Sequence, residues 1–317
     1  MAFAVASTAL HDLLRAHRRP LQVLASLPSA VYLQVGGRCP AGQTARAGSP
    51  AIVALLARDA VRVPIGMLVA LPRMAAPFAG LQAGQTGAIG DGALSVGGQD
   101  YRPLRYWDPR VPQLRAGLAT PAAIRRCEAL GALTDQLPAD LRAALAEAGA
   151  AGTGAAGTGS GRVAGTERDA ARGVERDGAL GTVLGDPLPH PAALANAVRG
   201  LIGLGPGLTP AGDDVLAGAL LALGAAGDLP RQRALAEAVG GLLDRTTPLS
   251  AVLLDQACRS RAVPEVGALL RALACGGDLD SALVALSLVG HTSGPALALG
   301  IRLALRARAG NSLGRAA

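Results

Sequence analysis

The sequence contains no lysine, so all 30 of its basic residues are arginine. A Walker-type phosphate loop requires a lysine and a Schiff-base enzyme requires a reactive amine, so both classes are excluded. Aromatic residues make up only 2% of the chain, which leaves little material for a surface that stacks nucleic-acid bases. The net charge of +7 comes from scattered arginines. It therefore indicates solvated surface charge and binding of small anions, rather than binding of nucleic acid.

Cysteine and long apolar runs are also scarce. The four cysteines form no C-x-x-C pair, so neither a zinc site nor a dense disulfide framework is expected from Cys39, Cys127, Cys258 and Cys275. The longest uncharged apolar run, residues 215–227, is shorter than the roughly 20 residues that span a bilayer. No basic segment precedes the apolar patch at the start of the chain, so a secretory signal is not expected. We therefore expect a cytoplasmic protein with reduced thiols and no membrane partner.

The chain changes character near its first third. Its 317 residues exceed the roughly 250 to 300 at which one hydrophobic core stops growing, which favours two domains. We predict a first helix over residues 3–17. Segments such as "AVYLQVG" and "VRVPIGMLVAL" then carry β-branched residues bounded by glycine and proline. The sequence thus predicts the α+β class, with a β-rich domain over residues 1–118 and a mainly helical domain over residues 119–317.

The second part has the apolar spacing of amphipathic helices. Thr120 is a predicted N-cap with Pro121 at the first helical position. Towards the end of the chain we expect a helical array at about 191–203, 210–226, 231–245, 248–260, 264–275, 279–289 and 295–308. Gly218 and Gly300 lie inside two of these helices at a cost of about 1 kcal/mol each relative to alanine. Close approach of neighbouring helices is the usual compensation, so we expect it at both positions.

Residues 148–177 form a low-complexity stretch of glycine and alanine. Such a stretch has few core-forming residues to offset its ordering entropy. We expect a flexible insertion, and two interpretations stay open: a linker without function, or a lid over a site.

The stretch "GLGPGLTPAGDD", residues 203–214, leads from glycines into a predicted helix with Thr209 as N-cap and Pro210 at the first helical position. Such a loop offers backbone N–H groups and the positive end of the helix dipole to a phosphate or carboxylate. Asp213 shares a helix face with Leu216 and points to the packed side. A buried carboxylate requires an arginine, a ligand donor or a metal as its partner. Alternatively, both aspartates only complement the helix dipole.

A second helix start, "GHTSGPALALGIRLAL" at residues 290–305, repeats the order of glycine, threonine, glycine and proline before an apolar helix. The two helix starts are expected to face one another across a pocket. His291, one of four histidines, is predicted to act there as an acid and base or as a donor to a carbonyl. A purely structural histidine is the alternative.

A third helix start, "DRTTPLSAVLLDQA", has Thr247 as predicted N-cap, Pro248 at the first helical position and Ser250 just inside. Arg245 precedes it and is suited to grip a carboxylate or phosphate with two hydrogen bonds. The alternative is a surface arginine at the end of the preceding helix.

The motifs "GLGPGLTPAGDDVLAG", "RTTPLSAVLL" and "GHTSG", in this order, together with "YWDPRV", resemble the AllH family. The resemblance covers most of the chain outside residues 148–177. It implies a subunit of the oxamate carbamoyltransferase of anaerobic allantoin degradation, a route of purine catabolism, in which AllH works with AllF and AllG. It further implies carbamoyl transfer between phosphate and the amide nitrogen of oxamate. The Ser-Thr-Arg-Thr-Arg phosphate loop of the classical carbamoyltransferases is absent, so this chemistry would require a different site.

On this basis the predicted catalytic residues are Asp213, Asp214 and His291. The groups predicted to bind the anionic substrate belong to the three helix starts and are Gly205, Gly207, Thr209, Gly212, Arg245, Thr246, Ser250, Thr292, Ser293 and Gly294. No particular cofactor is predicted, and a divalent cation at the aspartates stays open. Two other functions also stay open: a non-catalytic assembly or ligand-sensing subunit, and a related amide transferase or hydrolase with another substrate.

Overall fold

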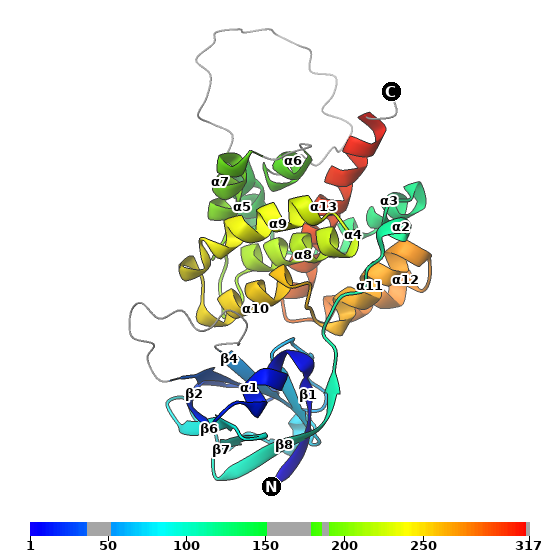
Figure 1. Cartoon of the computed structure of the whole chain (residues 1–317). Coiled ribbons are helices and arrows are strands. Elements are labelled where there is room, and N and C mark those ends of the chain that lie inside the picture. Colours follow the sequence, from blue (N-terminus) through cyan, green and yellow to red (C-terminus); the bar gives the residue numbers. More distant parts are fainter. Residues whose placement is uncertain (37–51, 151–178, 186–189, 315–317) are drawn as a thin grey trace.

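The computed structural model of the protein describes residues 1–36, 52–150, 179–185 and 190–314. A β-barrel is followed in the chain by a set of helices, and the two parts stack end to end (Figure 1). The predicted α+β class is confirmed. Cys39 and residues 151–177 of the predicted insertion lie outside the described residues. Whether the two parts are separate domains with a boundary at residue 118 stays a prediction.

Eight strands close the barrel in the order β1-β5-β4-β3-β2-β6-β7-β8. They are β1 (Ala2–Ser7), β2 (Arg19–Ser26), β3 (Ala30–Val35), β4 (Ile52–Leu56), β5 (Gly66–Val69), β6 (Thr86–Gly90), β7 (Ala93–Val96) and β8 (Gln99–Trp107). The pairs β1/β8 and β4/β5 are parallel, and the other neighbours are antiparallel. Alternate residues point inward, so Leu21 and Val23 of β2 and Leu33 and Val35 of β3 enter the barrel core.

The predicted helix over residues 3–17 is wrong in its first half. Residues 2–7 form strand β1, and the helical turns η1 (Thr8–Leu10) and α1 (His11–Arg15) follow it. In β1 burial alternates, because Ala4 is buried while Phe3 and Val5 are exposed. Pairing with both β5 and β8 therefore overrides the helical propensity of the alanines.

The helical part begins at residue 115. Its helices are α2 (Arg115–Leu118), α3 (Pro121–Cys127), α4 (Leu130–Thr134), α5 (Ala139–Ala150), α6 (Ala179–Gly185), α7 (Pro191–Leu201), α8 (Ala211–Ala225), α9 (Leu229–Gly240), α10 (Pro248–Cys258), α11 (Pro264–Cys275), α12 (Leu279–Ser287) and α13 (Ser293–Gly314). Helices α3 and α10 begin as predicted, since Thr120 and Thr247 cap them through their side chains. The helix expected to reach residue 245 instead ends at Gly240, and a short turn, η4 (Leu243–Arg245), follows.

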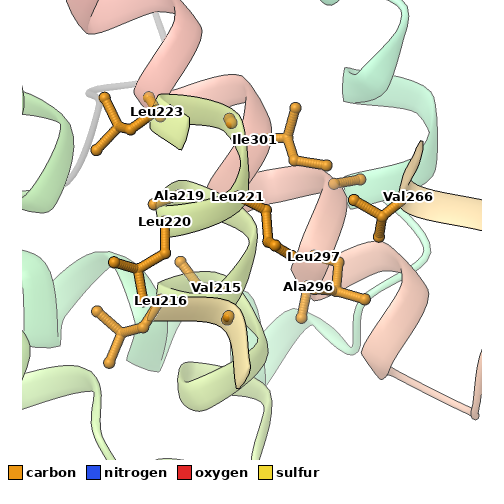
Figure 2. Close-up of a cluster of buried hydrophobic side chains, with 14 of the residues drawn as sticks. Val215, Leu216, Ala219, Leu220, Leu221, Leu223, Val266, Ala296, Leu297 and Ile301 are labelled. Atoms are coloured by element: carbon orange, nitrogen blue, oxygen red, sulfur yellow. The ribbon is translucent and has the colours of Figure 1, made fainter. Parts of the chain in front are cut away.

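Helices α8 and α13 pack closely at the centre of the helical part, and apolar side chains of both helices fill their surroundings (Figure 2). The two internal glycines allow this approach. A Cβ atom on Gly218 would overlap the carbonyl oxygen of Leu297, and one on Gly300 would overlap the carbonyl oxygen of Val215. The predicted close helix approach at both glycines is therefore confirmed.

The segment after β8 ties the barrel to the helices. The backbone N–H of Val111 donates to the Ser260 carbonyl at 2.8 Å, and the N–H of Ala262 donates to the Pro109 carbonyl at 2.9 Å. These bonds hold the end of the barrel next to the chain that follows α10.

No helix in the described part of the chain is long and apolar enough to cross a membrane.

Candidate functional site

Residues 203–210 form the glycine loop, which joins α7 to α8. Gly203, Gly205 and Gly207 have φ angles of +75°, +113° and +93°, and residues other than glycine rarely adopt such angles. A Cβ atom on Gly203 would also overlap the carbonyl oxygen of Arg245, so this glycine also allows a close backbone contact. The predicted N-cap is wrong by one residue, because α8 begins at Ala211 and Pro210 occupies the N-cap position.

Asp213 is the buried carboxylate that the helix face predicts, with an exposed fraction of 1%. Its Oδ1 accepts from the Gly203 N–H at 2.8 Å, and its Oδ2 accepts from the Ser250 hydroxyl at 2.6 Å and from the Thr246 hydroxyl. The partners of this carboxylate are therefore hydroxyl and N–H groups of the protein. They join the glycine loop, the first turn of α8 and the first turn of α10 into one hydrogen-bonded cluster.

Asp214 faces a different environment from its neighbour. Its Oδ2 is buried and has no hydrogen-bond partner among the described residues. Burial raises the pKa of the Asp214 carboxyl from 3.8 to about 7, a hydrogen bond with Ser293 opposes this rise, and the charge of Asp213 adds to it. A carboxyl with a pKa near neutrality can donate or accept a proton during a reaction, and its bare oxygen can accept a hydrogen bond from a ligand.

The start of α13 meets the start of α8, as predicted from the two glycine-led motifs. The Thr209 and Ser293 hydroxyl oxygens lie 3.3 Å apart, within hydrogen-bond distance. Gly290 has a φ angle of +62° and turns the chain into α13. His291, in contrast, is exposed. The two helix starts thus share a polar contact made by Thr209, Asp214 and Ser293.

These three residues lie in the wall of a cavity of about 320 Å³ between the barrel and the helices, named here the interface cavity. Its helical wall also includes Ala217, Leu221, Leu253, Arg261 and Leu297, and its barrel wall includes Tyr32, Leu56 and Val63. Most of these side chains are apolar. Burial raises the pKa of the Tyr32 phenol, which therefore stays protonated at neutral pH.

The structure brings some of the predicted site residues together and places others elsewhere. Thr209, Asp214 and Ser293 line the interface cavity, and Gly290 joins them there. Asp213, Thr246 and Ser250 form the hydrogen-bonded cluster behind the cavity wall. The remaining predicted residues do not line the cavity: Gly205, Gly207, Gly212, Arg245, His291, Thr292 and Gly294. Arg245 is exposed beside the glycine loop.

The barrel wall and Arg261 were absent from the residues predicted for the site. One signal for them is the motif "YWDPRV", because its Pro109 and Val111 form the backbone hydrogen bonds that hold residues 260–262 in place. Within the described ranges, no group of three or more His, Cys, Asp or Glu residues could hold a metal ion.

The fold and site define an α+β protein in which a closed barrel and a helical array enclose a cavity at two glycine-led helix starts. The helical array matches a protein-family model over residues 201–305, and the family is the oxamate carbamoyltransferase subunit AllH. The predicted resemblance to the AllH family is therefore confirmed over residues 201–305, and its extension to the rest of the chain stays a prediction. The matched segment contains the glycine loop and the starts of α8, α10 and α13. Comparisons with curated proteins and with solved structures found no match.

Proposed function

We propose that the chain is a subunit of a carbamoyltransferase that moves a carbamoyl group between phosphate and the amide nitrogen of a small amide acid such as oxamate. The match of residues 201–305 to the AllH family carries this proposal. The proposed partners are AllF-like and AllG-like subunits, and the proposed setting is allantoin degradation in the cytoplasm. The interface cavity is the proposed site, because its polar wall comes from the glycine-led motifs within the matched segment.

The reaction defines what the site must do. In the direction from oxalurate, the bond between the carbamoyl carbon and the amide nitrogen breaks, and a bond from that carbon to a phosphate oxygen forms. Hydrogen phosphate loses its proton and the amide nitrogen gains one, so the products are oxamate and carbamoyl phosphate. A group that exchanges a proton near pH 7 therefore serves the reaction directly.

Asp214 is the proposed acid and base. Its carboxyl has a pKa raised to about 7, so both protonation states are populated near neutral pH. In the protonated state it gives a proton to the departing amide nitrogen, and in the ionised state it takes one from hydrogen phosphate. Thr209 and Ser293, whose hydroxyls lie 3.3 Å apart beside it, are proposed to donate hydrogen bonds to the carbamoyl oxygen as negative charge develops there.

The other predicted residues have proposed roles around this centre. Gly205 and Gly207 give the glycine loop the backbone that carries Thr209 to the cavity wall, and the phosphate is proposed to lie beside Thr209 at the start of α8, where the helix dipole favours an anion. Asp213 is a positioning residue, because its hydrogen bonds to Gly203 and Ser250 fix the loop and the first turn of α8. His291, exposed just before Ser293, is proposed to polarise the carbamoyl carbonyl from the solvent side.

The test is phosphate-dependent cleavage of oxalurate by the chain purified together with its AllF-like and AllG-like subunits. The proposal expects oxamate and carbamoyl phosphate to form in equal amounts, and only when phosphate is present. If the assembled complex forms neither product, the proposed function is wrong.

A non-catalytic, ligand-sensing subunit is the second candidate, and the exposure of His291 outside the cavity lining favours it. In that case the partner subunits perform the chemistry and this chain only binds a ligand. The two functions differ in the expected effect of Asp214→Asn on the complex. A catalytic role predicts loss of kcat, whereas a sensing role predicts a changed ligand dependence with the maximal rate retained.

A further inference from the structure

The interface cavity runs lengthwise along α8. Asp214, Ala217 and Leu221 all line it, and their spacing of three and seven residues places them on one face of the helix. Seven residues of helix correspond to about 10 Å along its axis. The cavity wall thus extends well beyond the polar contact at the start of α8.

Helix α10 forms a second wall in the same direction. Its start lies beside the start of α8, because Ser250 donates to Asp213. Ser260, two residues past its end, lies beside Gly224 near the end of α8. The lining residues of α10 are Leu253 and Ala257, and Arg261, three residues past the end of the helix, also lines the cavity. Asp214 and Arg261 therefore occupy opposite ends of the cavity.

The wall between these two ends is apolar. Leu221, Leu253 and Leu297 contribute it from the helices, and Leu56 and Val63 contribute it from the barrel. The volume of about 320 Å³ corresponds to about ten waters at about 30 Å³ each. A ligand as small and polar as oxalurate would leave most of this apolar surface without a partner.

We propose that the interface cavity binds an acyl urea whose carbamoyl end lies at Asp214, whose carboxylate lies at Arg261, and whose chain of methylene groups covers the apolar wall between them. This inference rests on the proposed carbamoyl chemistry for the identity of the polar end. It makes oxalurate, which has no methylene group, the shortest member of a substrate class in which this chain prefers longer members.

Each part of such a ligand finds a complementary group. The urea N–H groups donate to the buried Oδ2 of Asp214, which has no hydrogen-bond partner among the described residues. The Arg261 guanidinium has five N–H donors, and Gln256 Oε1 accepts from its Nη1 at 3.2 Å. A planar guanidinium also suits a carboxylate with two parallel hydrogen bonds. Each methylene group that leaves water for the apolar wall strengthens binding by about fourfold.

The experiment measures the dissociation constants of a homologous series by calorimetry on the full chain. The series consists of N-carbamoyl monoamides of dicarboxylic acids with zero to six methylene groups, and oxalurate is its first member. The proposal expects the Kd to fall by about fourfold for each methylene group until the ligand spans the cavity, and then to rise. Equal or tighter binding of oxalurate relative to every longer member would overturn it, as would no binding by any member.

Variants test which wall the ligand contacts. Ala217→Leu narrows the middle of the cavity and is expected to weaken the best long ligand at least tenfold while changing oxalurate binding little. Arg261→Gln is expected to weaken the best long ligand at least tenfold while changing oxalurate binding little, because oxalurate held at Asp214 is too short to reach Arg261. The matched controls are Ala143→Leu and Arg271→Gln, two exposed helix positions outside the cavity lining. Circular dichroism verifies that each variant is folded. If Ala217→Leu does not fold, the dependence of Kd on ligand length in the wild-type protein tests the proposal without it.

Turnover by the assembled complex separates this inference from the proposed function. If long acyl ureas bind tightly and none is cleaved with phosphate, the ligand class stands and the carbamoyltransferase function is wrong. If oxalurate is cleaved and the longer members bind no more tightly, the function stands and the ligand class is wrong.

Discussion

The Ser250 hydroxyl donates a hydrogen bond of 2.6 Å to Oδ2 of Asp213, and this bond joins the first turn of α10 to the first turn of α8. Ser250 and Asp213 are both buried. The two helices carry walls of the interface cavity, so the bond fixes the relative position of those walls. Asp213 therefore acts on the site by holding α8, α10 and the glycine loop in position, whereas Asp214 lines the cavity itself.

Removal of this hydrogen bond is expected to destabilise the protein. Ser250→Ala leaves a buried carboxylate with one donor fewer, which lowers the free energy of unfolding by about 1.5–3 kcal/mol. Urea denaturation measures this change. Ser281→Ala is the matched control, because its exposed hydroxyl bonds to the exposed Asp278, and its expected effect is at most about 0.5 kcal/mol. Equal effects of the two substitutions would contradict the role of Ser250.

The internal glycines of α8 and α13 are expected to resist substitution. Gly218→Ala forces a Cβ atom into the Leu297 carbonyl oxygen, so the helices must separate and the free energy of unfolding falls by about 1–3 kcal/mol. Gly240→Ala is the control, because a Cβ atom at that position would meet no neighbouring atom within 4 Å. There the expected change is a stabilisation of about 0.5–1 kcal/mol. Thermal unfolding that ranks the two variants in the opposite order would show that α8 and α13 are not in close contact.

Asp214 is expected to make stability depend on pH. Its pKa is about 7 in the folded protein and 3.8 in the unfolded chain, so the folded state binds more protons between these values. The stabilising contribution is complete below pH 3.8 and is lost as the pH rises through 7, and its size is about 4 kcal/mol. Asp214→Asn removes it. As the pH rises from 5 to 8, the free energy of unfolding is therefore expected to fall in the wild type and not in the variant through this group. Parallel pH profiles of the two proteins would show that Asp214 is not the titrating group.

His291 is tested by its effect on the reaction rather than on stability. If its imidazole polarises the carbamoyl carbonyl, His291→Ala lowers kcat of the assembled complex by at least about a hundredfold. The exposed His190, which does not line the interface cavity, provides the control His190→Ala. An unchanged kcat for His291→Ala would remove this residue from the catalytic group while leaving Asp214 in it.

Local signals predicted much of the helical part. Thr247 followed by proline marked the start of α10, and the glycines at positions 218 and 300 indicated close helix contact, because these features act within one helix or between two adjacent helices. The cap at Thr209 was wrong because Pro210 keeps a non-helical backbone, with φ −55° and ψ 140°, so α8 begins one residue later, at Ala211. The meeting of the two helix starts was predictable from their shared motif, but the pairing of the Thr209 and Ser293 hydroxyls, 84 residues apart, was not.

The same limit applies to the barrel side of the site. Tyr32 and Val63 line the interface cavity, but the pairing of eight strands and the stacking of the barrel on the helices bring them there. The first strand was mistaken for a helix because alanine-rich residues favour a helix locally, and only the pairing of β1 with β5 and β8 makes it a strand. The buried location of Asp213 was predictable, since helical spacing alone places it among apolar residues.

The most direct measurement of the central claim is the kcat for phosphate-dependent cleavage of oxalurate by the assembled complex carrying Asp214→Asn. The amide cannot exchange the proton that the reaction moves, so kcat is expected to fall by about a hundredfold to ten-thousandfold. Asp280→Asn, an exposed aspartate in the first turn of α12, is expected to retain the wild-type kcat. A wild-type kcat in the folded Asp214→Asn complex would contradict the assignment of the reaction to the interface cavity.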